Sequence, residues 1–298
     1  MCFVLGQSPL CQDHRAGHSR GCRAFEQPDY LGEDAELMLT ATALLTDGIF
    51  EDLFPTGLLA STFVDLAQLD TTLQGHPDLT PAERDLMSGL RVEKRRRDWL
   101  GGRLAAKRAV IRLATVGGFD WHPTSLQDIE VLPSHTREPI VYSSETGLPV
   151  PMQVSISHSG QFAAAVASRS DHWRLGLDLE RAEATDPALY HLAFRDSEMW
   201  EIERVPPRLR PVAVLVLWTA KEAISKALGT GLSVCLQDIE LALPVGFLCE
   251  NSSSRRFTGY LRDRGPHFTV LTCCRGDYIV SLAWAAPLQD GWEGSQSR

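Results

Sequence analysis

Apolar residues at three- and four-residue steps predict a helix over residues 218–229. The apolar stripe consists of Trp218, Ala220, Ala223, Ile224 and Ala227. Gly229 suits a C-terminal cap. On the polar side, Glu222 and Lys226 are four residues apart and therefore share a face. A solvated ion pair is the simpler interpretation, but a carboxylate and an ammonium at this spacing can also act together at a site.

Helical and strand patterns follow one another along the rest of the chain. We expect a helix over residues 34–54, a strand over residues 58–66, and a helix that starts at Thr80 with a capping box completed by Glu83. Residues 1–27 carry no usable periodicity, and we predict a disordered tail there.

Alternating residues in the middle of the chain predict a pair of strands. The first is expected over residues 154–160 and the second over residues 161–168, joined by a Ser/Gly turn that carries Ser157 and His158. A turn histidine with no further role is the simpler interpretation of His158. We expect this strand pair to open the second half of the chain.

A third strand pattern, over residues 175–180, places two acids on one face. Asp178 and Glu180 are two residues apart and point the same way, whereas the leucines beside them face the core. Neighbouring carboxylates repel each other unless a cation lies between them. Oxygen ligands of this kind suit Mg²⁺, with Glu222 as a natural third ligand.

Residues 93–108 are the most basic stretch of the chain and are predicted to be helical. A solvated charged face is one interpretation. Gly101 and Gly102 favour a closer contact, because glycine inside a helix costs about 1 kcal/mol relative to alanine. Their presence suggests that another backbone or a ligand passes close to this helix.

An internal repeat relates this helix to the one at residues 218–229. Residues 105–114 align with residues 219–228 in their small, basic and apolar positions, and the pentapeptide LQDIE occurs at residues 126–130 and again at residues 236–240. Two matched segments in the same order indicate two α+β halves related by a pseudo-twofold axis. A ligand site is expected where such halves join.

Composition places the chain among ordinary globular proteins. Its 298 residues include 29 Lys and Arg against 38 Asp and Glu, and the resulting charge of −9 provides no general field for nucleic acid or an acidic membrane. No apolar run is long enough to span a bilayer. We also expect no signal peptide, because arginines interrupt the N-terminal stretch.

The seven cysteines contain no C-x-x-C pattern, which favours reduced thiols and a cytoplasmic protein. Cys11, His14, His18 and Cys22 have the chemistry to ligate zinc. Their spacing matches no common zinc finger, however, and a flexible tail is the simpler interpretation.

Together these motifs resemble the signature of the 4′-phosphopantetheinyl transferase superfamily. The resemblance is carried by Gly176-x-Asp178-x-Glu180, by Trp218-x-x-Lys221-Glu222-Ala223-x-x-Lys226 and by Ser157-His158-Ser159. It covers residues 58–286 and is closer to the larger, two-half enzymes that serve polyketide, fatty-acid and nonribosomal peptide synthases. It implies an α+β fold of two similar lobes, each a small antiparallel sheet packed with a long helix.

The resemblance also implies an activity. The 4′-phosphopantetheine group of coenzyme A would be transferred to a serine of an apo acyl or peptidyl carrier protein, with release of 3′,5′-ADP. Asp178, Glu180 and Glu222 would hold Mg²⁺, for which Mn²⁺ can substitute, and Glu222 or a metal-bound water would deprotonate the serine. The catalytic residues would be Glu222, Lys226 and His158, and coenzyme A would contact Arg97, Arg103, Lys107, Ser157, His158, Lys221 and Lys226.

One position departs from the family pattern, because Leu148 stands where a basic residue is expected before the histidine strand. Two other functions remain open. One is a non-catalytic module that binds coenzyme A or a nucleotide, and the other is an Mg²⁺-dependent phosphohydrolase that transfers to water.

We expect a partly disordered N-terminal extension over residues 1–57, a first lobe over residues 58–150, a second lobe with the metal site over residues 151–287, and a disordered tail over residues 288–298. We also expect a monomer that binds neither nucleic acid nor membranes.

Overall fold

The computed structural model describes residues 45, 47–71, 76–116, 118–169, 174–182, 190–229, 234–242, 254–262 and 265–285. These residues all belong to one compact unit, Leu31–Arg298. The predicted tails, the zinc pattern from Cys11 to Cys22 and most of the predicted helix over residues 34–54 lie outside the described residues.

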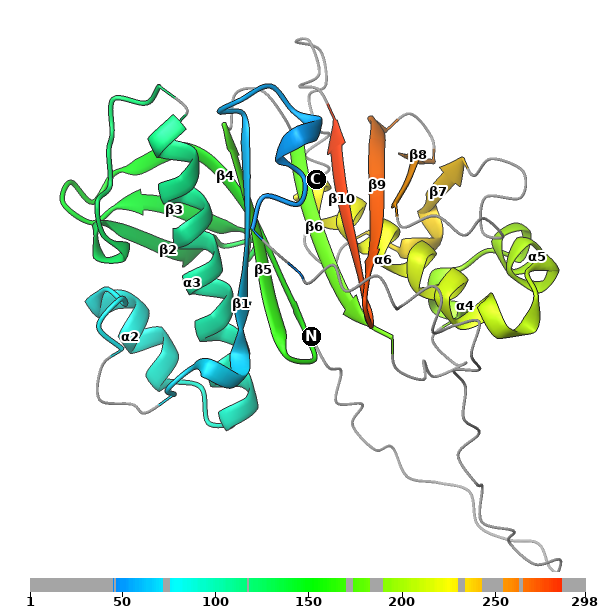
Figure 1. Cartoon of the computed structure of the whole chain (residues 1–298), viewed down its shortest axis with the longest axis horizontal. Coiled ribbons are helices and arrows are strands. Elements are labelled where there is room, and N and C mark those ends of the chain that lie inside the picture. Colours follow the sequence, from blue (N-terminus) through cyan, green and yellow to red (C-terminus); the bar gives the residue numbers. More distant parts are fainter. Residues whose placement is uncertain are drawn as a thin grey trace, which may run out of the picture. The chain divides into compact units, whose positions relative to one another are not determined.

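The described residues form two five-stranded antiparallel sheets (Figure 1). The first sheet has the order β1 (Leu59–Asp65), β5 (Phe162–Arg169), β4 (Pro149–Ser159), β3 (Pro139–Ser143) and β2 (Ile129–Pro133). The second has the order β6 (Arg174–Arg181), β10 (Tyr278–Ala285), β9 (His267–Arg275), β8 (Ser254–Leu261) and β7 (Ile239–Ala242).

The helices repeat the same plan in each half. The first half contains α2 (Pro81–Ser88), α3 (Glu93–Val116) and the 3₁₀ helices η1 (Glu51–Leu53), η2 (Leu66–Gln68) and η3 (Leu126–Asp128). The second contains α4 (Tyr190–Ala193), α5 (Asp196–Arg204), α6 (Arg210–Leu228), η5 (Pro207–Leu209) and η7 (Leu236–Asp238). Each half thus runs from one strand through short helices and one long helix to four further strands, which confirms the predicted α+β fold of two similar lobes.

The prediction for the middle strand pair was wrong in one respect. β4 and β5 pair with each other and with β3 and β1, so they close the first sheet and do not open the second. The chain therefore changes sheet after Arg169, and not near residue 150. Sequence alternation predicted both strands but carries no information about their distant partners.

The predicted helix ends were largely correct. At the start of α2, the Thr80 N–H donates to Glu83 Oε2 (2.9 Å) and the Glu83 N–H donates to Thr80 Oγ1 (3.4 Å), which completes the capping box. Gly229 ends α6 in the left-handed conformation, at φ +70°. α6 begins at Arg210, earlier than predicted, because the apolar run before Trp218 is also helical.

Residues 47–57 are part of the fold, although we grouped them with the N-terminal extension. They form a turn and η1 in place of the expected α-helix. Phe50 is fully buried, and Glu51 accepts a hydrogen bond from the Ser61 N–H (3.1 Å) and pairs with Arg112 (3.0 Å).

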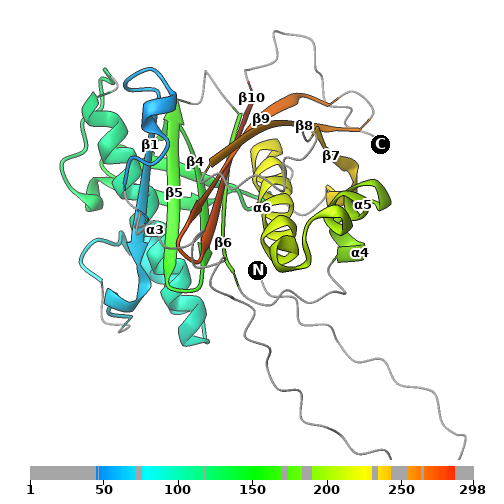
Figure 2. The same ribbon diagram turned by 45° about the vertical axis from the view of Figure 1, so that its right-hand side comes forward.

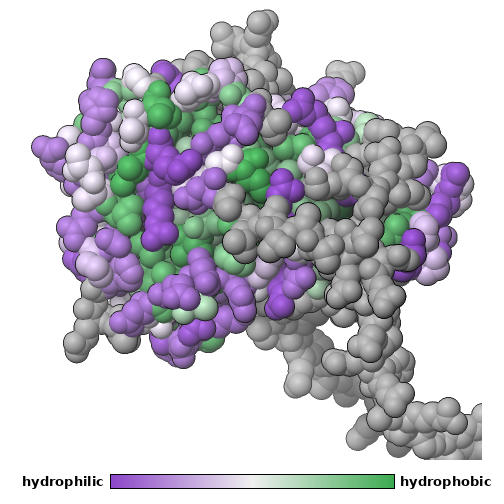
Figure 3. Space-filling model, viewed as in Figure 1, coloured by the Kyte–Doolittle hydropathy of each residue, from purple (hydrophilic) through white to green (hydrophobic). Residues whose placement is uncertain are grey.

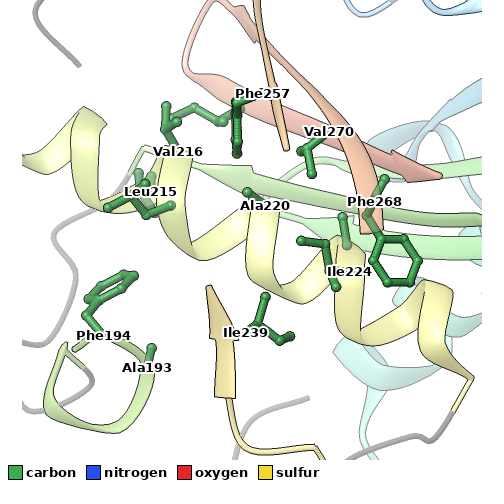
Figure 4. Close-up of a cluster of buried hydrophobic side chains, with 14 of the residues drawn as sticks. Ala193, Phe194, Leu215, Val216, Ala220, Ile224, Ile239, Phe257, Phe268 and Val270 are labelled. Atoms are coloured by element: carbon green, nitrogen blue, oxygen red, sulfur yellow. The ribbon is translucent and has the colours of Figure 1, made fainter. Parts of the chain in front are cut away.

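The described residues are layered in the order helix, sheet, sheet, helix (Figures 1 and 2). Three apolar clusters fill the spaces between these layers. α3 packs on the first sheet through residues such as Leu104 and Val110. Leu177 and Leu179 of β6 pack between the sheets. α6 covers the other face of the second sheet, where Figure 4 shows Ile224 beside Phe268 of β9.

The surface carries hydrophobic residues among hydrophilic ones, as Figure 3 shows for one face. Within the described ranges, the large hydrophobic side chains exposed to solvent come from separate segments: Leu86, Val92, Val116, Leu148, Leu192 and Trp200. Among the described helices, none is both long and apolar enough to cross a membrane.

Candidate active site

The candidate site lies where β4 of the first sheet runs beside β6 of the second. Ser155, Ser157 and Ser159 point from β4 toward β6, and their hydroxyl oxygens accept the N–H groups of Leu177 (2.9 Å), Leu179 (3.2 Å) and Arg181 (3.0 Å). We call these three residues the serine row. Their hydroxyls act on the backbone of β6 as carbonyl groups do between paired strands.

Ser157 and His158 therefore lie within a strand, and not at a turn as predicted. The turn follows at Gly160, which has φ +56°. A Cβ atom at this position would clash with the Tyr278 hydroxyl. Side chains alternate along β4. Ser157 thus faces the second lobe, whereas His158 faces α3 of the first.

Asp178 is at the centre of the site and is buried. Its Oδ1 accepts hydrogen bonds from Ser157 Oγ (2.9 Å) and from Lys226 Nζ (2.7 Å). Its Oδ2 is buried and has no hydrogen-bond partner within the described residues. An unpartnered carboxylate oxygen is costly when buried, which indicates that a cation or donor belongs there.

Two further carboxylates face the same region. Glu180 accepts a hydrogen bond from Ser159 Oγ (2.8 Å), and burial together with the charge of Asp178 raises its pKa to about 7. Burial and Asp178 also raise the pKa of Glu222 on α6. Lys226 opposes both shifts, but one ammonium does not balance three acids.

His158 links this region to α3. Its Nδ1 lies 3.7 Å from Asp98 Oδ2, and Asp98 also accepts a hydrogen bond from Lys94 Nζ (2.9 Å). Partial burial lowers the pKa of the imidazole, an effect that Asp98 opposes and that Lys226 and Lys94 reinforce. The ring therefore favours its neutral form.

Among the described residues, Arg103 on α3 forms no ion pair with a carboxylate. Its guanidinium stacks over Trp99 at 4.8 Å from the ring centroid, and its buried Nε has no hydrogen-bond partner in the part of the chain that the structure describes. Burial lowers its pKa to about 10, although Glu83 opposes this. A desolvated guanidinium that makes no ion pair with a described carboxylate is suited to bind an anion such as a phosphate.

Lys107 and Lys221 do not have the surroundings of phosphate ligands. Both side chains are fully buried, and both pair with a glutamate of the preceding short helix. Lys107 Nζ lies 2.5 Å from Glu83 Oε2, and Lys221 Nζ lies 2.6 Å from Glu198 Oε2. Backbone carbonyls complete both sites, so these lysines tie each short helix to its long helix.

The structure also shows why glycines occupy three helix and strand positions. A Cβ at Gly101 would clash with Leu66, and one at Gly102 would come within 2.8 Å of Ile156, so α3 lies directly on the first sheet. The predicted neighbour was another backbone or a ligand, but side chains make this close approach. A Cβ at Gly176 would clash with the Ala223 carbonyl oxygen on α6.

Two other predicted positions lie apart from these contacts. Arg97 forms an exposed pair with Glu93 one turn away on α3 (2.7 Å). Leu148 is exposed in the turn before β4. It provides no positive charge at the position where the family pattern has a basic residue.

The residues present have the chemistry for a divalent cation. Asp178, Glu180 and Glu222 are hard oxygen donors, and no described residue forms a hydrogen bond with Asp178 Oδ2. No group of three or more His, Cys, Asp or Glu side chains in the described ranges is arranged to hold an ion by itself. Mg²⁺ in phosphate sites is commonly held by one or two carboxylates together with substrate oxygens, so a complete protein cage is not required.

Sequence reasoning gave no role to two members of this site, although Ser159 belongs to the Ser157-His158-Ser159 motif. Ser159 could have been found from the two-residue spacing of the serine row. Asp98 could not, because its contact with His158 depends on how α3 docks on β4.

Comparisons with known proteins bear on the second half of the chain. Residues 174–283 match the model of the 4′-phosphopantetheinyl transferase superfamily. No curated protein matches. Among solved structures, holo-[acyl-carrier-protein] synthase of Thermotoga maritima matches with 19% identity and a TM-score of 0.29, covering 47% of this chain and 76% of that one. Residues 174–283, which contain β6, α6 and the strands β7 to β10, are thus similar to the 4′-phosphopantetheinyl transferase superfamily.

Proposed function

We propose that this protein transfers the 4′-phosphopantetheine group of coenzyme A to a serine of an apo carrier protein and releases 3′,5′-ADP. The observation that carries the proposal is the acid cluster beside Lys226 at the junction of the lobes. One carboxylate oxygen of Asp178 in this cluster has no hydrogen-bond partner among the residues that the structure describes. This cluster lies on the elements that match the superfamily.

Different residues of the chain bind the phosphates, accept the proton and support the structure of the site. Lys226, His158 and Arg103, with Arg97 at the start of α3, contact the phosphates of coenzyme A. Glu222 accepts the proton of the carrier serine, because burial raises its pKa toward the range of an effective base. Lys107 and Lys221 have structural roles in this scheme.

Asp178, Glu180 and Glu222 would hold Mg²⁺ or Mn²⁺. A bound cation would offset the charge of the diphosphate and of the leaving phosphate. The protein's contribution is to place these acids between two lobes, so that substrate oxygens can complete the coordination.

The two-lobed fold favours the larger type of these transferases, which serve polyketide, fatty-acid or nonribosomal peptide synthases. We further propose a monomer in the cytoplasm, with acyl or peptidyl carrier domains as partners. The free thiols of Cys235, Cys273 and Cys274 among the described residues are consistent with a reducing compartment.

Incubation with coenzyme A, Mg²⁺ and an apo acyl carrier protein tests the proposal, with intact mass spectrometry of the carrier as the readout. We expect the carrier to gain the mass of one phosphopantetheine group and 3′,5′-ADP to accumulate in equal amount. Cleavage of coenzyme A without a carrier would indicate a phosphohydrolase. Binding of coenzyme A with no product of either kind would indicate a binding module.

A further inference from the structure

The serine row makes two kinds of contact that can be separated. All three serines accept a backbone N–H from β6, which joins the two sheets. Ser157 and Ser159 have a carboxylate as a second partner, Asp178 and Glu180 respectively. Ser155 has no carboxylate partner in the described ranges, because the residue at the corresponding position of β6 is Gly176.

The direction of these hydrogen bonds is fixed by their surroundings. A serine hydroxyl has one proton to donate and two lone pairs that accept. The Arg181 N–H can only donate to Ser159 Oγ, so the hydroxyl proton of Ser159 is directed to the ionised form of Glu180, whose Oε2 is 2.8 Å away.

Ser157 is constrained even more strongly. The Leu179 N–H (3.2 Å) and Lys226 Nζ (3.0 Å) are both donors to its hydroxyl oxygen. Its proton is therefore directed to Asp178 Oδ1, 2.9 Å away. This contact occupies one oxygen of Asp178 and leaves Oδ2 without a partner in the described residues.

We propose that Ser157 and Ser159 are positioning residues through which the first lobe orients the acids of the second lobe toward a divalent cation. The inference rests on the proposed function for the identity of that cation. It assigns to Ser159 a role toward Glu180 that is distinct from its role in joining the sheets. Ser155 has only the joining role.

The variants Ser159→Ala and Ser155→Ala form a matched pair for the test. Both remove a hydroxyl that accepts a β6 N–H, so both should lower the melting temperature to a similar extent. Only Ser159→Ala also removes the donor to a carboxylate. Ser159→Thr keeps the hydroxyl on a residue that strands accept readily.

The measurement is the affinity for Mn²⁺ in the presence of coenzyme A, followed by electron paramagnetic resonance of free Mn²⁺. Hydrogen-bond partners of metal ligands commonly change metal affinity by about 10- to 100-fold. We expect Ser159→Ala to weaken Mn²⁺ binding about tenfold or more. Ser155→Ala should stay within about twofold of the unmodified protein, and Ser159→Thr should stay close to it.

Equal Mn²⁺ affinities for Ser159→Ala and Ser155→Ala would overturn the proposal, as would an unmodified protein that binds no Mn²⁺. If Ser159→Ala weakens Mn²⁺ binding while the unmodified protein fails to modify any carrier protein, the positioning role stands and the proposed transfer reaction fails. The two ideas can therefore fail separately.

Discussion

Arg103 and Lys107 lie one turn apart on α3, yet their surroundings give them different tasks. Lys107 is enclosed by Glu83 and the Asp78 carbonyl, and removing either partner of such a pair leaves a buried charge uncompensated. Arg103 stacks on the face of Trp99 and forms no ion pair with a carboxylate in the described part of the chain. Similar basic residues within one motif thus include one structural cation and one candidate ligand.

Replacing Arg103 by alanine should weaken coenzyme A binding without lowering stability. Hydrogen bonds to charged groups contribute about 1.5–3 kcal/mol, so the dissociation constant should rise about tenfold to a hundredfold. Calorimetric titration and a melting curve measure the two effects. Arg108→Ala on the exposed side of α3 is the control and should change neither. Unchanged affinity in Arg103→Ala would show that the phosphates bind elsewhere.

Glu180 should make the metal-free protein less stable as the pH rises. Burial and Asp178 raise its pKa from 4.5 to about 7, so its charged form is disfavoured in the folded state. The contribution of protonated Glu180 to the stability of the folded state is complete below the unfolded-state pKa of 4.5. It is lost as the pH rises through the folded-state pKa of about 7.

The variant Glu180→Gln should therefore be more stable than the unmodified protein at pH 8 by about 3 kcal/mol, given about 1.36 kcal/mol per pKa unit. The two proteins should converge near pH 5. Urea unfolding at both pH values measures this, with Glu145→Gln in an exposed turn as the control. Addition of Mg²⁺ at pH 8 should reduce the difference in the free energy of unfolding between the two proteins. A variant that is no more stable at pH 8 would contradict the repulsion between the acids.

At the level of elements, the contact between β6 and α6 depends on Gly176. A methyl group there would meet the backbone of α6 at the Ala223 carbonyl, which cannot move independently of its helix. Gly176→Ala should therefore lower the free energy of unfolding by about 1–3 kcal/mol or more.

Chemical denaturation measures this change in unfolding free energy. Gly89→Ala is a suitable control, because Gly89 lies at the end of α2 with φ −70° and its added Cβ would make only ordinary contact with the Leu86 carbonyl. Equal stability of the two variants would mean that α6 does not lie on β6 as described.

Local signals in the sequence predicted helices and strands well. They failed to predict features that depend on contacts between residues far apart in the sequence. The Thr80 capping box, the Gly229 cap and the alternation in β6 each depend on neighbouring residues, and all three are confirmed. Periodicity could not show that β4 and β5 belong to the first sheet. It also could not show that Glu198 neutralises Lys221, because that partner lies on another helix.

For the whole molecule, duplication has kept the framework and divided the chemistry. The buried Lys–Glu pair occurs in both halves, at Lys107 and at Lys221. The acids on β6 and Glu222 on α6 belong to the second half. In the first half, the residue that aligns with Glu222 is Arg108. The two halves therefore cannot provide two equivalent sites.

We expect one coenzyme A to bind per chain, with activity in the monomer. Calorimetric titration of coenzyme A in the presence of Mg²⁺ gives the stoichiometry, and light scattering of the active fraction gives the molecular mass. Two molecules bound per chain would contradict the division between the halves, and so would activity confined to a dimer.

The most direct test of the account is the intact mass of an apo carrier protein after incubation with coenzyme A, Mg²⁺ and either the unmodified protein or Asp178→Ala. The unmodified protein should add one phosphopantetheine group to each carrier. Asp178→Ala should leave the carrier unmodified while its circular dichroism stays native, because the substitution removes an acid from a cluster in which the acids repel each other. Undiminished transfer by a natively folded Asp178→Ala protein would contradict the account.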